Sequence, residues 1–567
     1  MRRAVAWIVS AVAMLALCPS TGFAAGGPIM PLSEVQAGMD CTADTVIAGT
    51  TISSFDVHVL GVVEDPQIGP RILIRASGPA VEGTGIAEGF SGSPVYCPDA
   101  MGEMRNAGAI SAGVGDYGNN DALVTPIEQM LGEPVTPPSS APRFTERVRP
   151  LLGPLMVGGL SPSLLHILQK AGQAAGRTIL AAPAGAAASF PVQSLVPGAS
   201  VAVSYSDGAI PTGAVGTVTY RDGANVYAFG HELDGAGRRS LLLQDAYVYS
   251  VIGNPIGLSY KLAAPGHTVG TLTSDTPNAV VGEVGPAPAL VPVLVTARDL
   301  DTGHVLSLES DVADETAIGL PLGTSLVDTV APMEAGQAAT AIYDGPPANE
   351  SGQMCVTVRL RESRQPLGFC NRYVGTGFPG DAGLLPPELA TGVTSDVSSA
   401  FQLLERVRFA SLHVTRVDAQ IEAQRGLAEG SIVSAHAPRH ARRGHTISVR
   451  LVVRVFRGKL ETLSFPLTIP RHPRDRRLVV SLHGPPPSGA GGADALLSAL
   501  TSQLGGPTGP PLLGPGPSSI TQLRHKFAAI GSYDGIDAKF SGGSFKRVYR
   551  NRSLLITGKT ALSILVR

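Results

Sequence analysis

Short apolar runs bounded by turn-forming residues recur along most of this 567-residue chain. Each run has about the length of one β-strand, and glycine, proline or aspartate stands at its ends. The chain holds 68 glycines and 46 prolines, about a fifth of its residues, where about 12% is the average. Such a sequence favours many short strands joined by tight turns over a helix bundle or a coiled coil. An apolar content of 44% and a net charge of −2 argue against disorder throughout. We therefore expect a mainly β fold with several domains.

The runs fall into successive regions that predict the domain organisation. In a first region, 29–135, we expect strands at 54–63, 71–76, 93–96 and 107–113. A proline-rich joint with one helix over 164–175 fills residues 136–194, and Gly176 can cap that helix. In a second region, 195–330, we expect strands at 200–205, 213–220, 226–229 and 290–297.

The remainder of the chain predicts further β structure and a flexible connection. Residues 335–484 read as a β-rich C-terminal domain, in which Thr446–Phe456 and Glu461–Ile469 form a hairpin of a β-sandwich. Residues 485–517 are rich in Gly, Pro and Ser and predict a linker. Residues 518–567 form a basic C-terminal segment.

The N-terminus has the pattern of a secretory signal peptide. Arg2 and Arg3 precede an apolar stretch, Ala4–Leu17, and small residues follow up to Ala24. This order predicts a cleavable signal over 1–24, and the stretch is too short to span a bilayer comfortably. We expect no transmembrane span in the mature chain, and a secreted or periplasmic location.

Removal of the signal leaves four cysteines, which predict disulfides in an oxidising compartment. Three pairings are possible. We prefer Cys41 with Cys97 and Cys355 with Cys370, because each pair then stays within one expected domain. No cysteine spacing resembles a zinc site, and no metal or other cofactor is expected.

Charge is unevenly distributed along the chain. Residues 401–567 hold 24 Lys and Arg against 9 Asp and Glu, whereas residues 1–400 hold 19 against 36. The basic region could meet an acidic envelope surface, such as lipopolysaccharide or lipid, or the acidic half of the same chain. Few aromatic residues and the lack of a nucleic-acid motif disfavour nucleic acid as the partner.

The sharpest chemical motif is Gly-Phe-Ser-Gly-Ser-Pro at 89–94. A serine becomes a nucleophile when a base takes its proton and nearby donors hold the oxyanion. A glycine two places before a serine lets the backbone turn, so that the amides of Gly89 and Ser91 can point at one oxygen. The alternative interpretation is a glycine–serine turn in a β domain.

The residues around this motif resemble those of the SpoIVB peptidase family, the sporulation serine peptidases and their bacterial relatives. The resembling blocks are Met30–Val35, Phe55–Val62, Thr84–Tyr96 and Thr125–Glu128, with a further stretch from Gly216–Tyr220 to Ala228–His231. The resemblance implies a two-part, chymotrypsin-like β-barrel core with Ser91 as the nucleophile and His231 as the general base. It further implies narrow protein or peptide substrates and self-cleavage.

The chain departs from the family pattern in two respects. The serine half precedes the histidine half, although a triad depends on positions in space and not on chain order. The position of the family's acidic residue falls near Ser77. Another acid can substitute, for which Asp275 is our candidate, or the site is a Ser/His dyad, or it is inactive. Glu232 is next to the histidine but would point elsewhere on a strand.

Other candidate residues have simpler interpretations. His58 is a rival base, yet its alternation with Phe55, Val57 and Val59 places it on the polar face of a strand. The sequence assigns no role to Lys261. A metal site at His436, His440 and His445 is disfavoured, because the neighbouring arginines oppose cation binding and indicate a basic loop. The glycine string Gly113–Gly118 fits a dinucleotide-binding motif by its letters, but no βαβ unit surrounds it.

Two functions from different classes follow. The favoured one is an exported serine endopeptidase of SpoIVB-like type, with Ser91 and His231 catalytic, Asp275 as the acid, and the amides of Gly89 and Ser91 as the oxyanion hole. The alternative is a catalytically inactive homologue that binds proteins in the cell envelope or acts as a scaffold.

Overall fold

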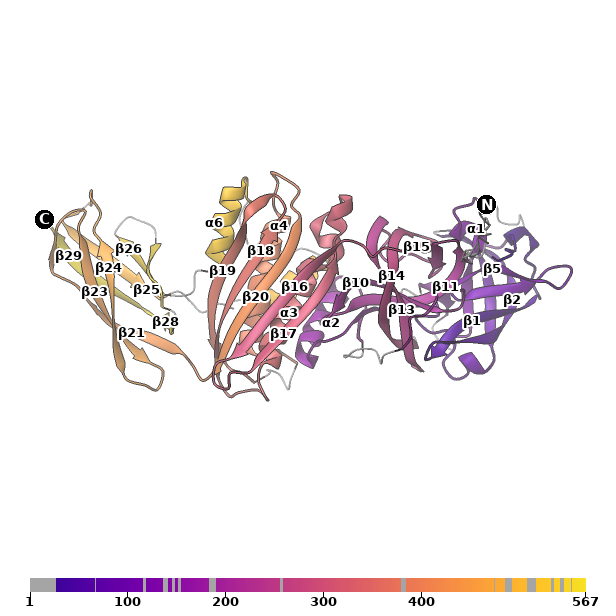
Figure 1. Cartoon of the computed structure of the whole chain (residues 1–567), viewed down its shortest axis with the longest axis horizontal. Helices are drawn as coiled ribbons and strands as arrows, with labels where there is room; N and C mark the ends of the chain where they lie inside the picture. Colours follow the sequence, from indigo (N-terminus) through magenta and orange to yellow (C-terminus); the bar gives the residue numbers. More distant parts are fainter. Residues whose placement is uncertain are drawn as a thin grey trace, which may run out of the picture.

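The computed structural model describes the chain from residue 27 onward, apart from short gaps. The gaps are residues 67, 116–118, 136–140, 145–147, 151–153, 183–189, 255–258, 379–383, 474, 485–491, 507–515, 532–534, 541–544 and 552. The predicted signal, 1–24, therefore lies outside the described residues, as do two stretches of the predicted linker. The described parts form an elongated molecule of four units in a row (Figure 1). No helix among them is long and apolar enough to cross a bilayer.

The first unit is a closed antiparallel β-barrel. Its ring runs β4-β1-β2-β3-β6-β5 and closes because β4 also pairs with β5. Along β2, Phe55, Val57 and Val59 are buried while Asp56 and His58 are exposed, as the alternating sequence predicted. The strands are β1 (Asp40–Ala48), β2 (Thr51–Asp65), β3 (Gly69–Ser77), β4 (Pro94–Pro98), β5 (Met104–Val114) and β6 (Asp121–Pro126), with β7 (Val148–Pro150) beside β5; the short helices η1 (Leu32–Glu34), η2 (Pro79–Val81) and α1 (Ile127–Met130) accompany them.

The second unit is another closed antiparallel barrel. Its ring runs β10-β13-β14-β15-β12-β11 and closes through the pairing of β10 with β11. The strands are β10 (Ser200–Gly208), β11 (Thr212–Asp222), β12 (Asn225–Ala228), β13 (Gly237–Ile252), β14 (Tyr260–Thr276) and β15 (Ala279–Val284); the short strands β8 (Leu155–Val157) and β9 (Ile179–Ala181) extend from β11. The mainly β fold is thus confirmed, with two barrels side by side at the N-terminal end of the molecule (Figure 1).

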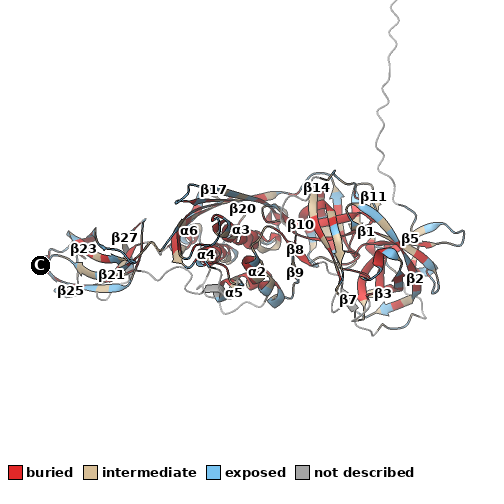
Figure 2. Cartoon of the chain, turned by 90° about the horizontal axis from the view of Figure 1, so that it is seen from below, coloured by how far each residue is buried: buried red, intermediate tan, exposed pale blue. Residues whose placement is uncertain are grey.

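The third unit is a sheet covered by helices on one face (Figure 2). Its strands are β16 (Leu290–Asp299), β17 (Val305–Ala313), β18 (Glu350–Leu360), β19 (Ser363–Gly375) and β20 (Val414–Arg425). β17 pairs with β10, so this sheet continues directly from the second barrel. The helices are α2 (Pro162–Ala174), α3 (Val327–Ala341), α4 (Glu388–Glu405), α5 (Gly492–Gln503) and α6 (Ile520–Ile530), with the short helices η3 (Glu315–Ile318) and η4 (Leu322–Ser325).

The fourth unit is a β-sandwich with a core of its own. Its hairpin, β23 with β24, confirms the predicted pair of strands. One sheet runs β24-β23-β21-β28 and the other β22-β29-β25-β26-β27. The strands are β21 (Glu429–His436), β22 (His440–Ala441), β23 (Thr446–Val455), β24 (Leu460–Thr468), β25 (Arg477–His483), β26 (Ile536–Phe540), β27 (Phe545–Tyr549), β28 (Leu555–Thr557) and β29 (Lys559–Val566).

Both disulfides have the predicted pairing. Cys41 and Cys97 join β1 to β4 in the first barrel. Cys355 and Cys370 lie opposite each other in the hairpin of β18 and β19. Each bond therefore joins neighbouring strands of one sheet.

The helical layer differs most from the expectations. The range expected as a linker, 485–517, contains α5, whose Leu496 and Leu500 are fully buried against the other helices. The range expected as one C-terminal domain, 335–484, contributes β18–β20 to the third unit and β21–β25 to the sandwich. The expected basic segment, 518–567, contributes α6 to the third unit and β26–β29 to the sandwich. Helix α3 is buried around most of its circumference, so it lacks the one-sided apolar stripe that marks a helix in a sequence.

Candidate active site

The Ser91 turn, residues 87–93, leads into β4 of the first barrel and lies against β11 of the second. Three carbonyl oxygens of the turn accept hydrogen bonds from two threonines of β11. Thr217 donates its hydroxyl to Gly89 O (3.1 Å) and its amide to Ser91 O (2.8 Å), and the Thr219 hydroxyl donates to Gly92 O (2.7 Å). The second barrel thus fixes the shape of a turn that belongs to the first.

The amides of this turn divide into two groups. Those of Phe90, Gly92 and Ser93 donate to the carbonyl oxygens of Ala87, Ile110 and Phe90, at 2.8–2.9 Å. The amides of Gly89 and Ser91 donate no hydrogen bond to any residue that the structure describes. These are the two amides that the sequence motif assigned to an oxyanion hole. Buried amides are normally hydrogen-bonded, so the pair is suited to receive a ligand oxygen.

Gly92 brings the Ser91 turn into direct contact with the segment that carries His231. A methyl group placed on Gly92 would lie 1.9 Å from Thr217 O and 2.5 Å from the amide nitrogen of Phe229. Only glycine permits so close an approach, and the backbone φ of +91° also favours glycine. Ser91 and His231, far apart in the sequence, thus lie on two segments that pack against each other.

His231 follows two residues with left-handed backbone. Phe229 and Gly230 both have a φ of 70°, which is uncommon for a bulky residue such as phenylalanine. The Thr125 hydroxyl, on β6 of the first barrel, donates to Gly230 O at 2.7 Å. Each barrel therefore holds the candidate-site loop of the other. Backbone strain of this kind is concentrated at functional sites.

The imidazole of His231 is held in one tautomer. Its Nδ1 lies 2.6 Å from the carbonyl oxygen of Glu232, and a carbonyl can only accept, so Nδ1 carries the proton. In the neutral ring Nε2 then carries the lone pair, as a general base requires. The Glu232 carboxylate instead folds towards Gly235.

Asp275 supports the loop that follows His231. Its carboxylate, fully buried on β14, accepts hydrogen bonds from the amides of Leu233 (2.7 Å), Asp234 (2.9 Å) and Ala236 (3.3 Å). These bonds orient the loop through its backbone, while the Glu232 carbonyl occupies Nδ1 of the ring, where the acid of a triad would bind. Direct stabilisation of the imidazolium by Asp275 stays a prediction.

The rival residues lie elsewhere. His58 is half-exposed on the outer face of β2, 2.8 Å from Asp40, as its place in the alternation predicted. His436, His440 and His445 are exposed, and no cluster of three metal-ligating side chains occurs among the described residues. Part of the glycine string 113–118 lies outside the described residues.

Lys261 is the functional candidate that the sequence analysis missed. It is buried at the start of β14, directly beneath the Ser91 turn, and its Nζ lies 5.1 Å from the centre of the Phe90 ring. Burial lowers the pKa of Lys261 to about 7. The strand alternation could have indicated this burial, because Lys261 lies two residues before the buried Ala263 and therefore on the same inward face of the strand.

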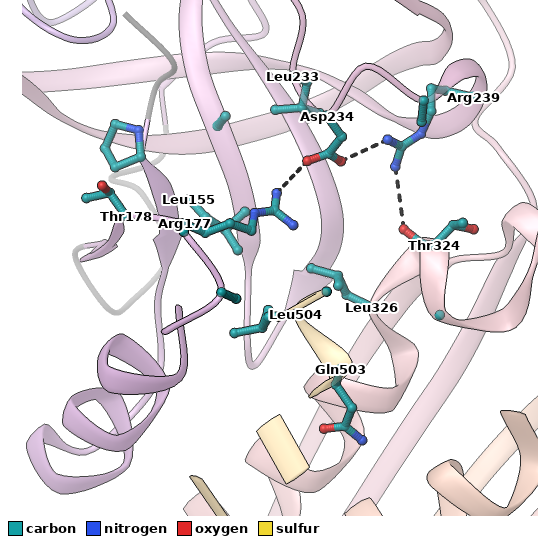
Figure 3. Close-up of a pocket in the computed structure, with 17 residues that line it drawn as sticks. Leu155, Arg177, Thr178, Leu233, Asp234, Arg239, Thr324, Leu326, Gln503 and Leu504 are labelled. Atoms are coloured by element: carbon teal, nitrogen blue, oxygen red, sulfur yellow. Dashed lines mark hydrogen bonds and ion pairs between the residues drawn. The ribbon is translucent and has the colours of Figure 1, made fainter. Parts of the chain in front are cut away.

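A pocket of about 480 Å³ adjoins the loop that follows His231 (Figure 3). Asp234 of this loop forms ion pairs with Arg177 (2.7 Å) and Arg239 (2.9 Å) in the pocket wall. Although burial acts in the opposite direction, the two guanidiniums hold the pKa of Asp234 below its usual value. Arg239 also forms two hydrogen bonds with Glu315 (2.8 and 3.0 Å). The charges of the wall thus satisfy one another, and the other lining residues are largely apolar: they include Leu155, Ala214, Leu233, Leu326 and Leu504.

Comparison with known proteins adds no further assignment. A scan against protein-family models, a search of curated proteins and a search of solved structures each found no match to this chain. The functional conclusion therefore depends on the geometry of the chain itself.

Proposed function

We propose that this chain is an exported serine endopeptidase, with Ser91 as the nucleophile and His231 as the general base. One observation carries the proposal: the amides of Gly89 and Ser91 donate no hydrogen bond to any described residue, and their turn packs on the segment that contains His231. The two disulfides and the predicted signal support export.

The chemistry is acyl transfer to serine. Ser91 Oγ attacks the carbonyl carbon of the peptide while its proton passes to Nε2 of His231, and the amides of Gly89 and Ser91 hold the resulting oxyanion. His231 then gives the proton to the leaving amine as the C–N bond breaks. Water, deprotonated by the same imidazole, releases the acyl group and restores the serine.

A fluorophosphonate probe tests this proposal. Ser91 Oγ should displace fluoride from phosphorus, and mass spectrometry of the digested protein should locate the adduct on Ser91. Ser91→Ala should abolish labelling. Ser93→Ala is the matched control, because it removes the other hydroxyl of the same motif and should leave Ser91 labelled. An adduct elsewhere, or none on the folded protein, would contradict the proposal.

Two observations favour the alternative function, a catalytically inactive envelope-binding protein. Ser91 is only 1% exposed, and a carbonyl instead of a carboxylate occupies Nδ1 of His231. A serine that cannot be reached would fail to label although the protein is folded. The probe experiment therefore separates the two functions.

The pocket beside the His231 loop predicts substrate selectivity. Because its charged residues pair with each other, we expect it to accept an apolar side chain of the peptide. Thr178→Trp, at an exposed lining position, should fill the pocket and lower kcat/KM for peptides with a large apolar residue at least about tenfold. Thr462→Trp, on the exposed face of the sandwich, is the control. Equal kcat/KM values for both variants would exclude the pocket from substrate binding.

A further inference from the structure

We propose that Lys261 is a positioning residue for the Ser91 turn, which it holds from beneath through its own backbone and through Thr217. This inference rests on the proposed function, because it assigns Lys261 the task of aiming the Gly89 amide at the reacting oxygen. The sequence motif does not include Lys261, and no contact with substrate is required of it.

The backbone of Lys261 fixes the peptide bond before Gly89. Its amide donates to Glu88 O at 2.9 Å, and the Glu88 amide donates to Ser259 O at 2.8 Å. In a trans peptide the N–H points opposite to the C=O. Since Glu88 O faces β14, the N–H of Gly89 points away from β14, to the side on which no described residue accepts it.

The side chain of Lys261 fixes the next peptide bond. Its Nζ donates to the hydroxyls of Thr45 (2.8 Å) and Thr217 (3.2 Å), and the Thr217 hydroxyl passes the interaction on to Gly89 O (3.1 Å). A methyl group on Gly89 would lie 3.0–3.1 Å from the carbons of the Lys261 side chain. The turn therefore rests directly on the lysine, and both peptide bonds of Gly89 are oriented by it.

The charge of Lys261 is unusual for a purely structural residue. Among the described residues its ammonium contacts two hydroxyls and an aromatic face but no carboxylate. The titratable residues next to these contacts along the chain are Glu88, whose carbonyl oxygen accepts from the Lys261 amide, Asp44 beside Thr45, and Tyr260 beside Lys261. The Asp44 carboxylate accepts from the Ser54 hydroxyl. Burial raises the pKa of Glu88 to about 7. The positive charge of Lys261 beneath the turn stabilises the negative charge of an oxyanion bound above it. Because this coupling is reciprocal, a bound oxyanion also stabilises the protonated form of Lys261.

The test is the rate of fluorophosphonate labelling of Ser91 measured from about pH 5.5 to about pH 9.5. With the unmodified protein we expect the rate to fall above about pH 7 as Lys261 loses its proton. Lys261→Met should lower the rate at pH 7 at least about tenfold and remove the alkaline fall. Glu88→Gln should keep the fall in labelling rate above about pH 7. This result would show that the fall is due to deprotonation of Lys261 and not of Glu88.

Two further variants separate positioning from general damage. Thr217→Val removes the hydroxyl at nearly constant volume and should slow labelling, whereas Thr217→Ser keeps the hydroxyl and should restore most of the rate. Lys261→Met should unfold at an equal or higher temperature than the unmodified protein at pH 7. The sign follows because burial disfavours the ammonium and lowers the pKa of Lys261 to about 7 in the folded chain. Lys261 therefore costs stability, and this cost is fully present below about pH 7 and is lost as the pH rises to the ordinary lysine pKa.

The outcomes distinguish the two proposals. If the unmodified protein does not label, the proposed function fails and this inference fails with it. If it labels at Ser91, but Lys261→Met shows the same rate and the same alkaline fall, only the role of Lys261 is overturned. A slower Lys261→Met that keeps the alkaline fall also overturns it.

Discussion

His231→Ala is expected to slow fluorophosphonate labelling of Ser91 at least about 1,000-fold, because the serine then has no base to take its proton. The 2.6 Å contact between Nδ1 and Glu232 O holds the ring in the tautomer whose lone pair is on Nε2. The measurement is the pseudo-first-order labelling rate at neutral pH, compared with that of the unmodified protein.

His58→Ala is the matched control for the loss of an imidazole. His58 is half-exposed and pairs with Asp40 on the outer face of the first barrel. Its removal should leave the labelling rate unchanged, and an exposed ion pair of this kind contributes little to stability. A His231→Ala protein that labels as fast as the His58→Ala protein would exclude His231 as the base.

Gly92→Ala is expected to have the largest structural effect of any single methyl group in the site. The new carbon would lie 1.9 Å from Thr217 O, which belongs to a strand of the other barrel and cannot rotate away as a side chain could. The two barrels must then separate at this point or the turn must move. We expect a loss of stability above about 4 kcal/mol, or failure to fold, together with loss of Ser91 labelling.

Gly102→Ala separates the effect of this collision from that of backbone conformation. Gly102 has a φ of +84°, close to that of Gly92, but a methyl group there would meet no atom within 4 Å. Its substitution should cost only the strain of a left-handed alanine, about 1 kcal/mol. Thermal unfolding of the two variants gives the comparison. Equal melting temperatures would mean that the barrels do not approach each other as closely at Gly92 as described.

The strands and disulfides were predictable because they depend on local patterns. Alternation of Phe55, Val57 and Val59 with polar residues marks one face of β2 whatever the rest of the chain does. The cysteine pairs each join neighbouring strands, so keeping each pair within one domain selected the correct pairing. The resemblance predicts that Ser91 and His231 share one site. The structure brings their backbone segments together at Gly92, and the reaction between the two side chains stays a prediction.

The remaining features depend on contacts between distant segments. Lys261 becomes relevant only because β14 pairs with Glu88, more than a hundred residues earlier, and no local pattern encodes that register. Asp275 was proposed for its charge, but its hydrogen bonds to backbone amides depend on how the loop after His231 folds. Helix α4 contains many threonines and serines, which are weak helix formers, so tertiary packing decides its conformation.

The order in which the chain passes through its units has a consequence for biogenesis. Strand β29, residues 559–566, lies between β22 and β25 in a sandwich sheet, and α6 packs on β19 of the preceding unit, where Phe527 meets Phe369. A chain that emerges from a ribosome or a translocation channel N-terminus first can close both barrels early. Neither later unit is complete until the last few dozen residues have arrived, so part of the apolar surface of the C-terminal half stays uncovered until then. Exposed apolar surface of this kind favours aggregation during synthesis.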